Sequence, residues 1–278
     1  MSDVNNVVES MESEVSYKPL IEDMTWSYSR VDSFDDCPYR WYLKYIHYPK
    51  LKDGKRFYSE FGTFMHKLLE AFYKGEITKE QAVTEFASGF NENTRGDGRP
   101  KFDIVKNYFK SGIQFLRELK PFRFETIAVE EKVEFEIAGH KFVGYIDYHG
   151  MENGEHVIVD NKSRNLKPRS GRKVPTKKDE ELDSMLKQLY IYAEAIRQKY
   201  GKLPKLLCFN CFKNGVFIEE PFNMEVYEKT LKWAEDKIKD IENTNEFYPN
   251  VDYFSCNFIC GMSEHCCYYE STKSRKGK

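Results

Sequence analysis

The chain has 278 residues, of which 40% are hydrophobic and 32% charged, so it can form one large domain with a sizeable core and a polar surface. Its formal net charge of −2 excludes a global basic field, so any surface for nucleic acid must be a local patch. The sequence has no apolar run of about 18 residues and no signal-peptide pattern at its start, so we expect a cytoplasmic protein without a membrane span.

The N-terminal region begins with a polar and acidic segment, residues 1–24, which is typical of a disordered tail. Order is expected from about Trp26. A short helix follows with Ser29 as its N-cap and Pro38 at its end, and a second helix covers Tyr39–Tyr45. The aromatic side chains of this second helix could stack on unpaired bases, but aromatic residues at helical spacing more often belong to a core.

Three longer helices come next. In the first, residues 61–73, apolar side chains recur at helical spacing. The second covers residues 78–90, where Thr78 and Gln81 form the pattern of a capping box. The third covers residues 102–119 and ends before Pro121.

From residue 126 onward, apolar and polar residues alternate with the period of two that is typical of strands. Three strands are predicted at residues 126–137, 142–148 and 157–162, joined by short turns as an antiparallel meander. A basic loop, a helix at 180–200, a strand pair at 206–212 and 215–219, and a last helix at 226–241 follow. The predicted class is therefore α/β, a mixed central sheet flanked by helices, with a helical N-terminal region and a Cys-rich C-terminal lobe.

The most informative residues lie at the ends of two adjacent strands. Asp147 follows Gly-Tyr-Ile, and Asp160 follows Val-Ile-Val, two residues before Lys162. Residues two apart on a strand point to the same face, and pairing of the strands brings Asp147 near Asp160. Converging carboxylates repel one another unless a cation lies between them, and oxygen ligands suit Mg²⁺ or Mn²⁺. Two carboxylates that bind a divalent ion, with a lysine beside them, are the minimal machinery for hydrolysing a phosphodiester bond.

Four motifs in order resemble the PD-(D/E)XK nuclease superfamily, and in particular its RecB-type exonuclease branch, which includes CRISPR-adaptation and phage exonucleases. They are Phe-Gly-Thr-Phe-Met-His66, Gly-Tyr-Ile-Asp147, Asp160-Asn-Lys162 and Gln188-Leu-Tyr-Ile-Tyr192. The resemblance covers the chain from residue 26 to residue 269. It implies a restriction-endonuclease-like core in one nuclease domain, residues 25–270, followed by a basic tail, residues 271–278.

The resemblance also implies a role for each motif residue. His66, Asp147, Asp160 and the backbone carbonyl of Asn161 would bind the metal. Asp147, Asp160 and Lys162 would act in catalysis, supported by Gln188 and Tyr192. On its own, His66 would more simply be a core histidine, and Gln188 and Tyr192 an ordinary polar pair one helical turn apart.

Seven cysteines in a chain without a secretion signal indicate free thiols or metal ligands rather than disulfides. The resemblance implies that Cys37, Cys256, Cys260 and Cys266 hold a [4Fe–4S] cluster that staples the two ends of the domain. Zinc and a set of buried thiols remain as alternatives, and Cys267 competes with Cys266 as the fourth ligand.

A basic loop begins at the lysine of the site. It carries Arg164, Lys167, Arg169, Arg172 and Lys173, which are candidate contacts to DNA phosphates. The alternative is a solvated loop whose charge is balanced by the acidic residues that follow it. Glycine and proline favour a mobile loop over a helix.

The function expected from these features is that of a Mg²⁺- or Mn²⁺-dependent DNA exonuclease in recombination, repair or phage DNA processing. Two alternatives are a non-catalytic DNA-binding or assembly subunit and an endonuclease of the same superfamily. The sequence does not identify a helicase, a recombinase or a self-association partner. It also does not distinguish single-stranded from double-stranded DNA, DNA from RNA, or the polarity of digestion.

Overall fold

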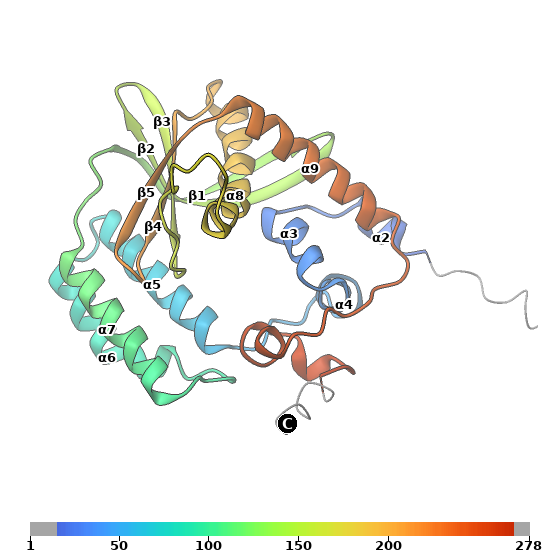
Figure 1. Cartoon of the computed structure of the whole chain (residues 1–278), viewed down its shortest axis with the longest axis horizontal. Coiled ribbons are helices and arrows are strands. Elements are labelled where there is room, and N and C mark those ends of the chain that lie inside the picture. Colours follow the sequence, from blue (N-terminus) through green and yellow to red (C-terminus); the bar gives the residue numbers. More distant parts are fainter. Residues whose placement is uncertain (1–15, 270–278) are drawn as a thin grey trace, which may run out of the picture.

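The computed structural model describes residues 16–269, which form a five-stranded sheet with helices on both faces (Figure 1). The longer helices and the strands, in chain order, are α3 (Tyr28–Asp36), α5 (Phe57–Tyr73), α6 (Lys79–Asn93), α7 (Phe102–Glu118), β1 (Glu125–Ile137), β2 (His140–Glu152), β3 (Glu155–Lys162), α8 (Lys177–Tyr200), β4 (Leu206–Cys211), β5 (Val216–Pro221) and α9 (Met224–Glu242). The short helices are α2 (Lys18–Glu22), α4 (Pro38–Tyr42), η1 (Leu43–His47), η2 (Ser255–Ile259) and η3 (Ser263–His265). None of these helices is long and apolar enough to cross a membrane.

The sheet is mixed, in the order β1-β2-β3-β4-β5, and this confirms the predicted α/β class with a strand meander. The first three strands are antiparallel, β4 runs parallel to β3 after the α8 crossover, and β5 returns antiparallel. The β2–β3 turn has Asn153 and Gly154 at φ 54° and 79°, which suits the tight two-residue hairpin that this dipeptide favours.

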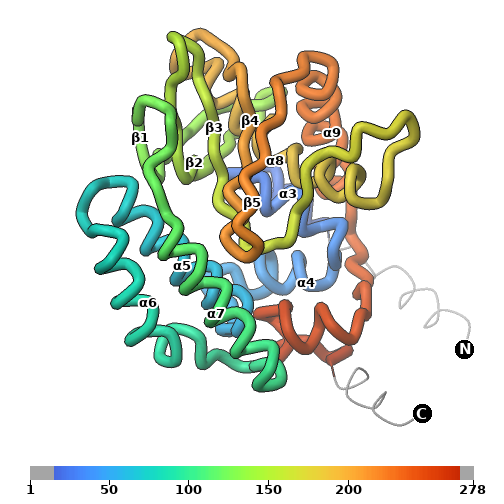
Figure 2. The backbone as a smooth tube through the Cα atoms, turned by 60° about the vertical axis from the view of Figure 1, so that its left-hand side comes forward, coloured from blue at the N-terminus to red at the C-terminus, as the bar shows by residue number. Residues whose placement is uncertain are grey.

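Two layers of helices cover the sheet (Figures 1 and 2). Helices α8, α9 and α3 share the largest hydrophobic cluster with one face, which includes Ile146, Ile158 and Leu189. Helices α5, α6 and α7 pack on one another in a second cluster that takes in Phe212 just after β4. Burial of these apolar faces is the main stabilising contribution to the domain.

Several predicted boundaries are wrong by a few residues. Helix α3 begins at Tyr28 with Ser27 as its N-cap, not Ser29, because the Ser27 side chain accepts the backbone N–H of Arg30. Helix α5 begins four residues before the predicted start. The predicted capping box of α6 is confirmed, since Thr78 and Gln81 bond reciprocally.

The N-terminal tail is shorter than predicted. Residues 1–15 and the basic tail 271–278 lie outside the described residues. Residues 16–24, predicted as disordered, include helix α2, whose Ile21 is fully buried in the main cluster. Of the aromatic residues predicted as core in 39–45, Trp41 is buried at 1% exposure and donates its indole N–H to the carbonyl of Arg30, whereas Tyr39, Tyr42 and Tyr45 are half-buried.

Candidate metal-dependent active site

Two strands and one helix bring the predicted site residues together. Asp147 lies within β2, Asp160 and Lys162 end β3, and His66 faces them from the middle of α5. The antiparallel register pairs Tyr148 with Val159, which places Asp147 beside Asp160. The sequence interpretation of these strands therefore leads directly to the observed juxtaposition.

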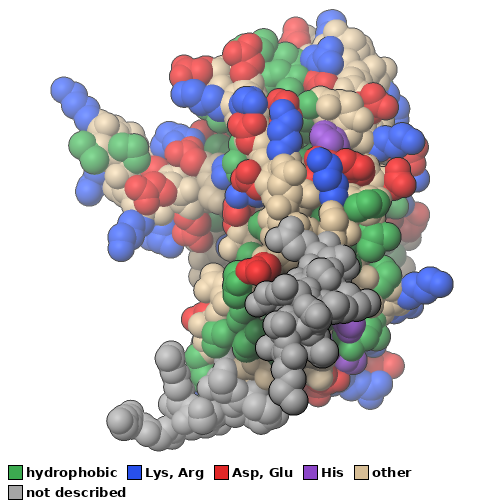
Figure 3. All heavy atoms as spheres, turned by 90° about the vertical axis from the view of Figure 1, so that its right-hand side faces the viewer, with side chains coloured by type: hydrophobic (Ala, Val, Ile, Leu, Met, Phe, Trp, Pro, Cys, Tyr) green, Lys and Arg blue, Asp and Glu red, His purple; other side chains and the backbone are tan. Residues whose placement is uncertain are grey.

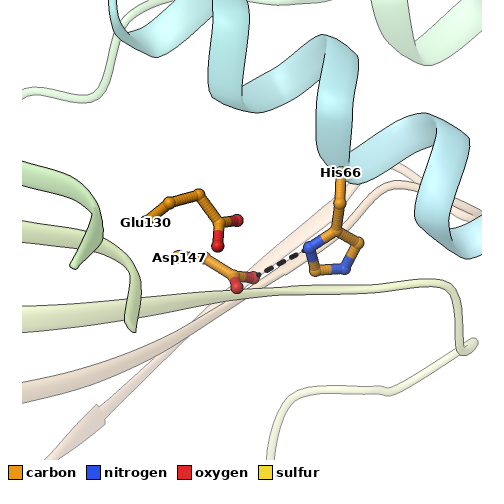
Figure 4. Close-up of side chains that lie close together, drawn as sticks. All are labelled: His66, Glu130 and Asp147. Carbon is orange, nitrogen blue, oxygen red and sulfur yellow. Dashed lines mark ion pairs between the residues drawn. The ribbon is translucent and has the colours of Figure 1, made fainter. Parts of the chain in front are cut away.

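A third carboxylate, that of Glu130 on β1, joins this site (Figure 4). Ligand atoms of His66, Glu130 and Asp147 all lie within 4.8 Å of one another. The three side chains point toward a common space from α5, β1 and β2, and His66 Nδ1 is 3.4 Å from Asp147 Oδ2. One imidazole and two carboxylates are a donor set that suits Mn²⁺ or Mg²⁺.

Asp160 lies beside this group rather than within it. Its Oδ2 is 2.8 Å from Lys162 Nζ, but the ammonium lies off the direction that a hydrogen bond requires. Among residues 16–269 this buried oxygen has no hydrogen-bond partner. An unsatisfied buried carboxylate oxygen is costly in an apo site and becomes favourable when it binds a cation, so the residues fit a divalent metal.

The backbone fixes the orientation of Asp147. The N–H of Asn161 donates to Asp147 Oδ2 over 2.6 Å, so β3 holds the carboxylate of β2. The Asn161 side chain turns away and accepts a hydrogen bond from Asn210 on β4. Asn161 therefore contributes to the site through its backbone, and its side chain is not a candidate ligand.

The pKa values of the site reflect burial and crowded negative charge. Burial, reinforced by the Asp147 carboxylate, raises the pKa of Glu130 to about 7. Burial also raises the pKa of Asp160 to about 6, against the opposing effect of Lys162. For His66, burial favours the neutral form, but the hydrogen bond and charge of Asp147 prevail and raise its pKa to about 9. Such clustering of perturbed groups is typical of a functional site.

Lys162 is held by α8. Its Nζ donates to Gln188 Oε1 over 2.6 Å, and Gln188 Nε2 donates to the Tyr192 hydroxyl over 3.3 Å. The Tyr192 ring packs on Gly144, where an added Cβ would come within 2.5 Å of the ring. The glycine of the Gly-Tyr-Ile-Asp motif is thus required for close approach of α8 to β2.

A cleft of about 620 Å³ opens over these residues. Residues of β2 and β3 and Gln188 of α8 line it together with residues of α3, α4 and the C-terminal lobe, among them Asp32, Arg40 and Gly261. Residues 48–56, which we call the strap, connect η1 to α5 and contribute Asp53 to the lining of the cleft. The strap is fastened where Gly54 N–H donates to Gly261 O over 2.8 Å and Arg56 Nε donates to Cys260 O over 3.0 Å.

The basic loop is more ordered than the sequence suggests. Leu166 is buried in the main cluster, and the Asp179 carboxylate accepts backbone N–H groups of Ser170 and Thr176, each over 2.7 Å. These contacts arise because Thr176 and Asp179 form a capping box that starts α8 at Lys177, three residues before the predicted start.

The loop's candidate DNA contacts differ in their availability. Arg164 lines the cleft, and Lys167, Arg172 and Lys173 are exposed. Arg169 is instead ion-paired with Asp183 and Glu220 on neighbouring elements. Elsewhere, Lys and Arg are interspersed with Asp and Glu on the face shown in Figure 3, in keeping with the small net charge.

The predicted cysteine set also comes together. Cys37 at the N-terminus of α4 and Cys256, Cys260 and Cys266 of the C-terminal lobe line one narrow cavity. Cys37 Sγ accepts backbone N–H groups of Arg40 and Asn250, each over 3.4 Å. Cys267 is exposed and lies 3.4 Å from the Tyr39 hydroxyl instead, and Cys208 and Cys211 are buried in β4.

Sequence reasoning missed Glu130. The strand was predicted from its alternating apolar residues, and Glu130 follows Val129 at a position that this alternation assigns to the solvent-facing side. The available signal was the interruption of that alternation at Glu131, since a charged residue there implies a local change in the strand.

A mixed sheet with Asp147 within β2, Asp160 and Lys162 at the end of β3, and a histidine facing them from α5 defines an α/β architecture of the restriction-endonuclease-like kind with an acidic site. The chain belongs to the PD-(D/E)XK nuclease superfamily, whose sequence profile matches residues 25–267. A search of curated protein sequences finds no match.

A comparison with solved structures supports the fold. A candidate exonuclease from Eubacterium rectale is similar over 92% of each chain, with a TM-score of 0.52 and 16% identity. The structure of SSO0001 matches 74% of this chain and 96% of its own, at 16% identity, with a TM-score of 0.31. At these identities the first likeness supports the fold, and the second carries no argument.

Proposed function

We propose that the protein is a Mg²⁺- or Mn²⁺-dependent DNA exonuclease. The observation that carries the proposal is the convergence of His66, Glu130 and Asp147 within 4.8 Å, next to the unsatisfied oxygen of Asp160 and the ammonium of Lys162. Superfamily membership supports a phosphodiester hydrolase, and the name of the Eubacterium rectale protein supports the exonuclease reading.

Each residue has a chemical role in this proposal. His66, Glu130, Asp147 and Asp160 would hold the divalent ion, which when bound acidifies water and neutralises charge on the scissile phosphate. Lys162 would orient the attacking water or contact the phosphate, and Gln188 limits the freedom of the Lys162 side chain. Tyr192 holds Gln188 in turn, so the α8 motif acts as a positioning element.

The preference for DNA ends is proposed on the name of the Eubacterium rectale protein. The strap bonds to the C-terminal lobe and contributes Asp53 to the lining of the cleft, so this wall of the cleft is tied to the lobe. Exposed Arg172 and Lys173 on the basic loop would contact phosphates near the entrance.

The test is digestion of end-labelled linear DNA, single-stranded and duplex, with Mn²⁺ or Mg²⁺, alongside closed circular single-stranded DNA. Wild type should degrade linear DNA from an end only with metal and spare the circle. Asp160→Ala and Lys162→Ala should lose activity, and Lys229→Ala, which removes an exposed lysine of α9, should retain it. Cleavage of the circle would indicate an endonuclease. DNA binding without cleavage by the metal-loaded wild type would indicate the binding subunit.

We also propose a [4Fe–4S] cluster on Cys37, Cys256, Cys260 and Cys266. The proposal is supported by the shared cavity that these four thiols line, since four thiolates can hold such a cluster. Cys267 is exposed and does not line the cavity, which supports Cys266 as the fourth ligand. A single zinc ion on the same four thiolates is the alternative.

Metal analysis of anaerobically purified protein tests this second proposal. Iron and acid-labile sulfide should be present, should be lost in Cys37→Ser and Cys266→Ser, and should be retained in Cys267→Ser. Stoichiometric zinc without iron would overturn it. Because metal content is measured without DNA, the result is independent of the nuclease assay.

A further inference from the structure

A polar cluster with a buried centre, formed by Glu131, His149 and His156, lies next to the candidate metal site but outside it. The Glu131 carboxylate accepts hydrogen bonds from Lys199 Nζ over 2.6 Å and the Tyr200 hydroxyl over 2.7 Å, and lies 2.7 Å from His149 Nδ1. His149 Nε2 is 2.9 Å from His156 Nδ1. We call these five residues the brace; they join β1, β2 and β3 to the C-terminal end of α8.

The brace lies where the strands change faces. On β1, Val129 packs with the cluster of Tyr148, whereas Val133 packs with the α8 face of the sheet. On β2, Ile146 packs on the α8 face and Tyr148 on the other. Residues two apart should share a face, so both strands turn over between these pairs. The residues at the turnover are Glu130 and Asp147.

Glu130 makes this turnover with a backbone that its residue type disfavours. Its φ is 54°, in the left-handed region, within a strand. A residue with a Cβ holds such a conformation only when the surrounding structure fixes it, and such residues gather at functional sites. The next residue, Glu131, is 8% exposed and contacts His149, Lys199 and Tyr200.

We propose that Glu131 is a positioning residue, and that the brace holds Glu130 in its left-handed conformation so that the Glu130 carboxylate faces His66 and Asp147. A regular strand with Glu131 free would direct Glu130 away from the group. This inference rests on the proposed metal-dependent function. It concerns the geometry of the site rather than the identity of the reaction.

The experiment is titration of the metal-free protein with Mn²⁺, followed by electron paramagnetic resonance of free Mn²⁺ and by calorimetry. Glu131→Gln keeps the shape of the side chain but removes the charge that Lys199 and His149 bind. Loss of a partner behind a metal ligand weakens affinity about 10- to 100-fold, so a change of that size is expected. Glu130→Gln should weaken Mn²⁺ binding to a similar degree, and the double variant should be no weaker than Glu130→Gln alone.

Glu194→Gln is the matched control. Glu194 on α8 is 5% exposed and is bonded to Arg197 and Gln198 of the same helix and to Tyr227 of α9. It should lower stability without changing Mn²⁺ affinity, which separates positioning from general damage to the fold.

The outcomes distinguish the inference from the function on which it rests. The brace proposal would be overturned if Glu131→Gln left the Mn²⁺ affinity unchanged. It would also be overturned if the double variant lost as much affinity as the product of the two single losses. Either result would leave the nuclease proposal intact. Absence of any Mn²⁺ binding by wild type would overturn the metal-dependent function itself.

Discussion

Replacing Asp160 with asparagine should stabilise the metal-free protein while removing nuclease activity. The Asp160 carboxyl is 4% exposed, and its burial raises its pKa from an ordinary 3.8 to about 6. When the pKa of an acid is higher in the folded state than in the unfolded state, the free energy of unfolding falls as the pH rises from the unfolded-state pKa to the folded-state pKa. Above pH 6 the ionised carboxylate therefore destabilises the apo fold in full.

The size of this effect follows from the shift. A change of about two pKa units corresponds to about 3 kcal/mol at most, and we expect a gain of about 1–3 kcal/mol in unfolding free energy for Asp160→Asn at pH 7.5. For a chain of this size, that gain raises the melting temperature by about 2–4 °C per kcal/mol.

The assay is thermal and urea unfolding with a chelator at pH 7.5 and at pH 5, with exposed Asp236→Asn as the control. The stabilisation should shrink at pH 5, where the wild-type carboxyl is largely protonated. Added Mn²⁺ should stabilise wild type more than the variant, since the ion binds only the folded site. A lower melting temperature for Asp160→Asn at pH 7.5 without metal would refute the reasoning.

Three further predictions concern other parts of the domain. Gly144→Ala should lower the unfolding free energy by about 1–3 kcal/mol, measured by the urea midpoint, because the new methyl group meets the buried Tyr192 ring. Arg172→Ala should reduce the salt dependence of DNA binding by about one unit of log–log slope, while Arg169→Ala, whose guanidinium is already ion-paired, should leave that slope unchanged. Against the opposing effect of burial, hydrogen bonds from its partners lower the pKa of Glu131 to about 2. The ionised carboxylate therefore contributes its full stabilisation above about pH 4.5, and this stabilisation is lost as the pH falls toward 2. Acid unfolding of Glu131→Gln, followed by circular dichroism, should lack this part of the pH dependence.

The sequence predicts the order of elements well because most of them have amphipathic patterns of the right period. The meander, the α8 crossover and the final strand pair are all found within a few residues of their predicted bounds. The errors lie mainly at the first residues of helices, because more than one nearby side chain can serve as the N-cap. Ser27 and Ser29 are both good caps, and only the packed structure selects Ser27.

The site is predictable where chemistry lies on regular elements. Asp147, Asp160 and Lys162 follow from strand pairing, and the Lys162–Gln188 contact follows from the resemblance. Glu130 could not be predicted, because its side chain reaches the site only through a left-handed residue within a strand. Arg169 illustrates the same limit, since its partners Asp183 and Glu220 are distant in sequence.

The fastening of the C-terminal lobe has a consequence for the order of folding. The strands that carry Asp147 and Asp160 are neighbours in the chain, so they can pair early with little loss of loop entropy. The thiol cavity instead depends on contacts such as Cys37 with Asn250 and Arg56 with Cys260, which span 213 and 204 residues. During synthesis the acidic site can therefore assemble first, and the cysteine cavity and the fastening of the strap form only after the C-terminal lobe has emerged.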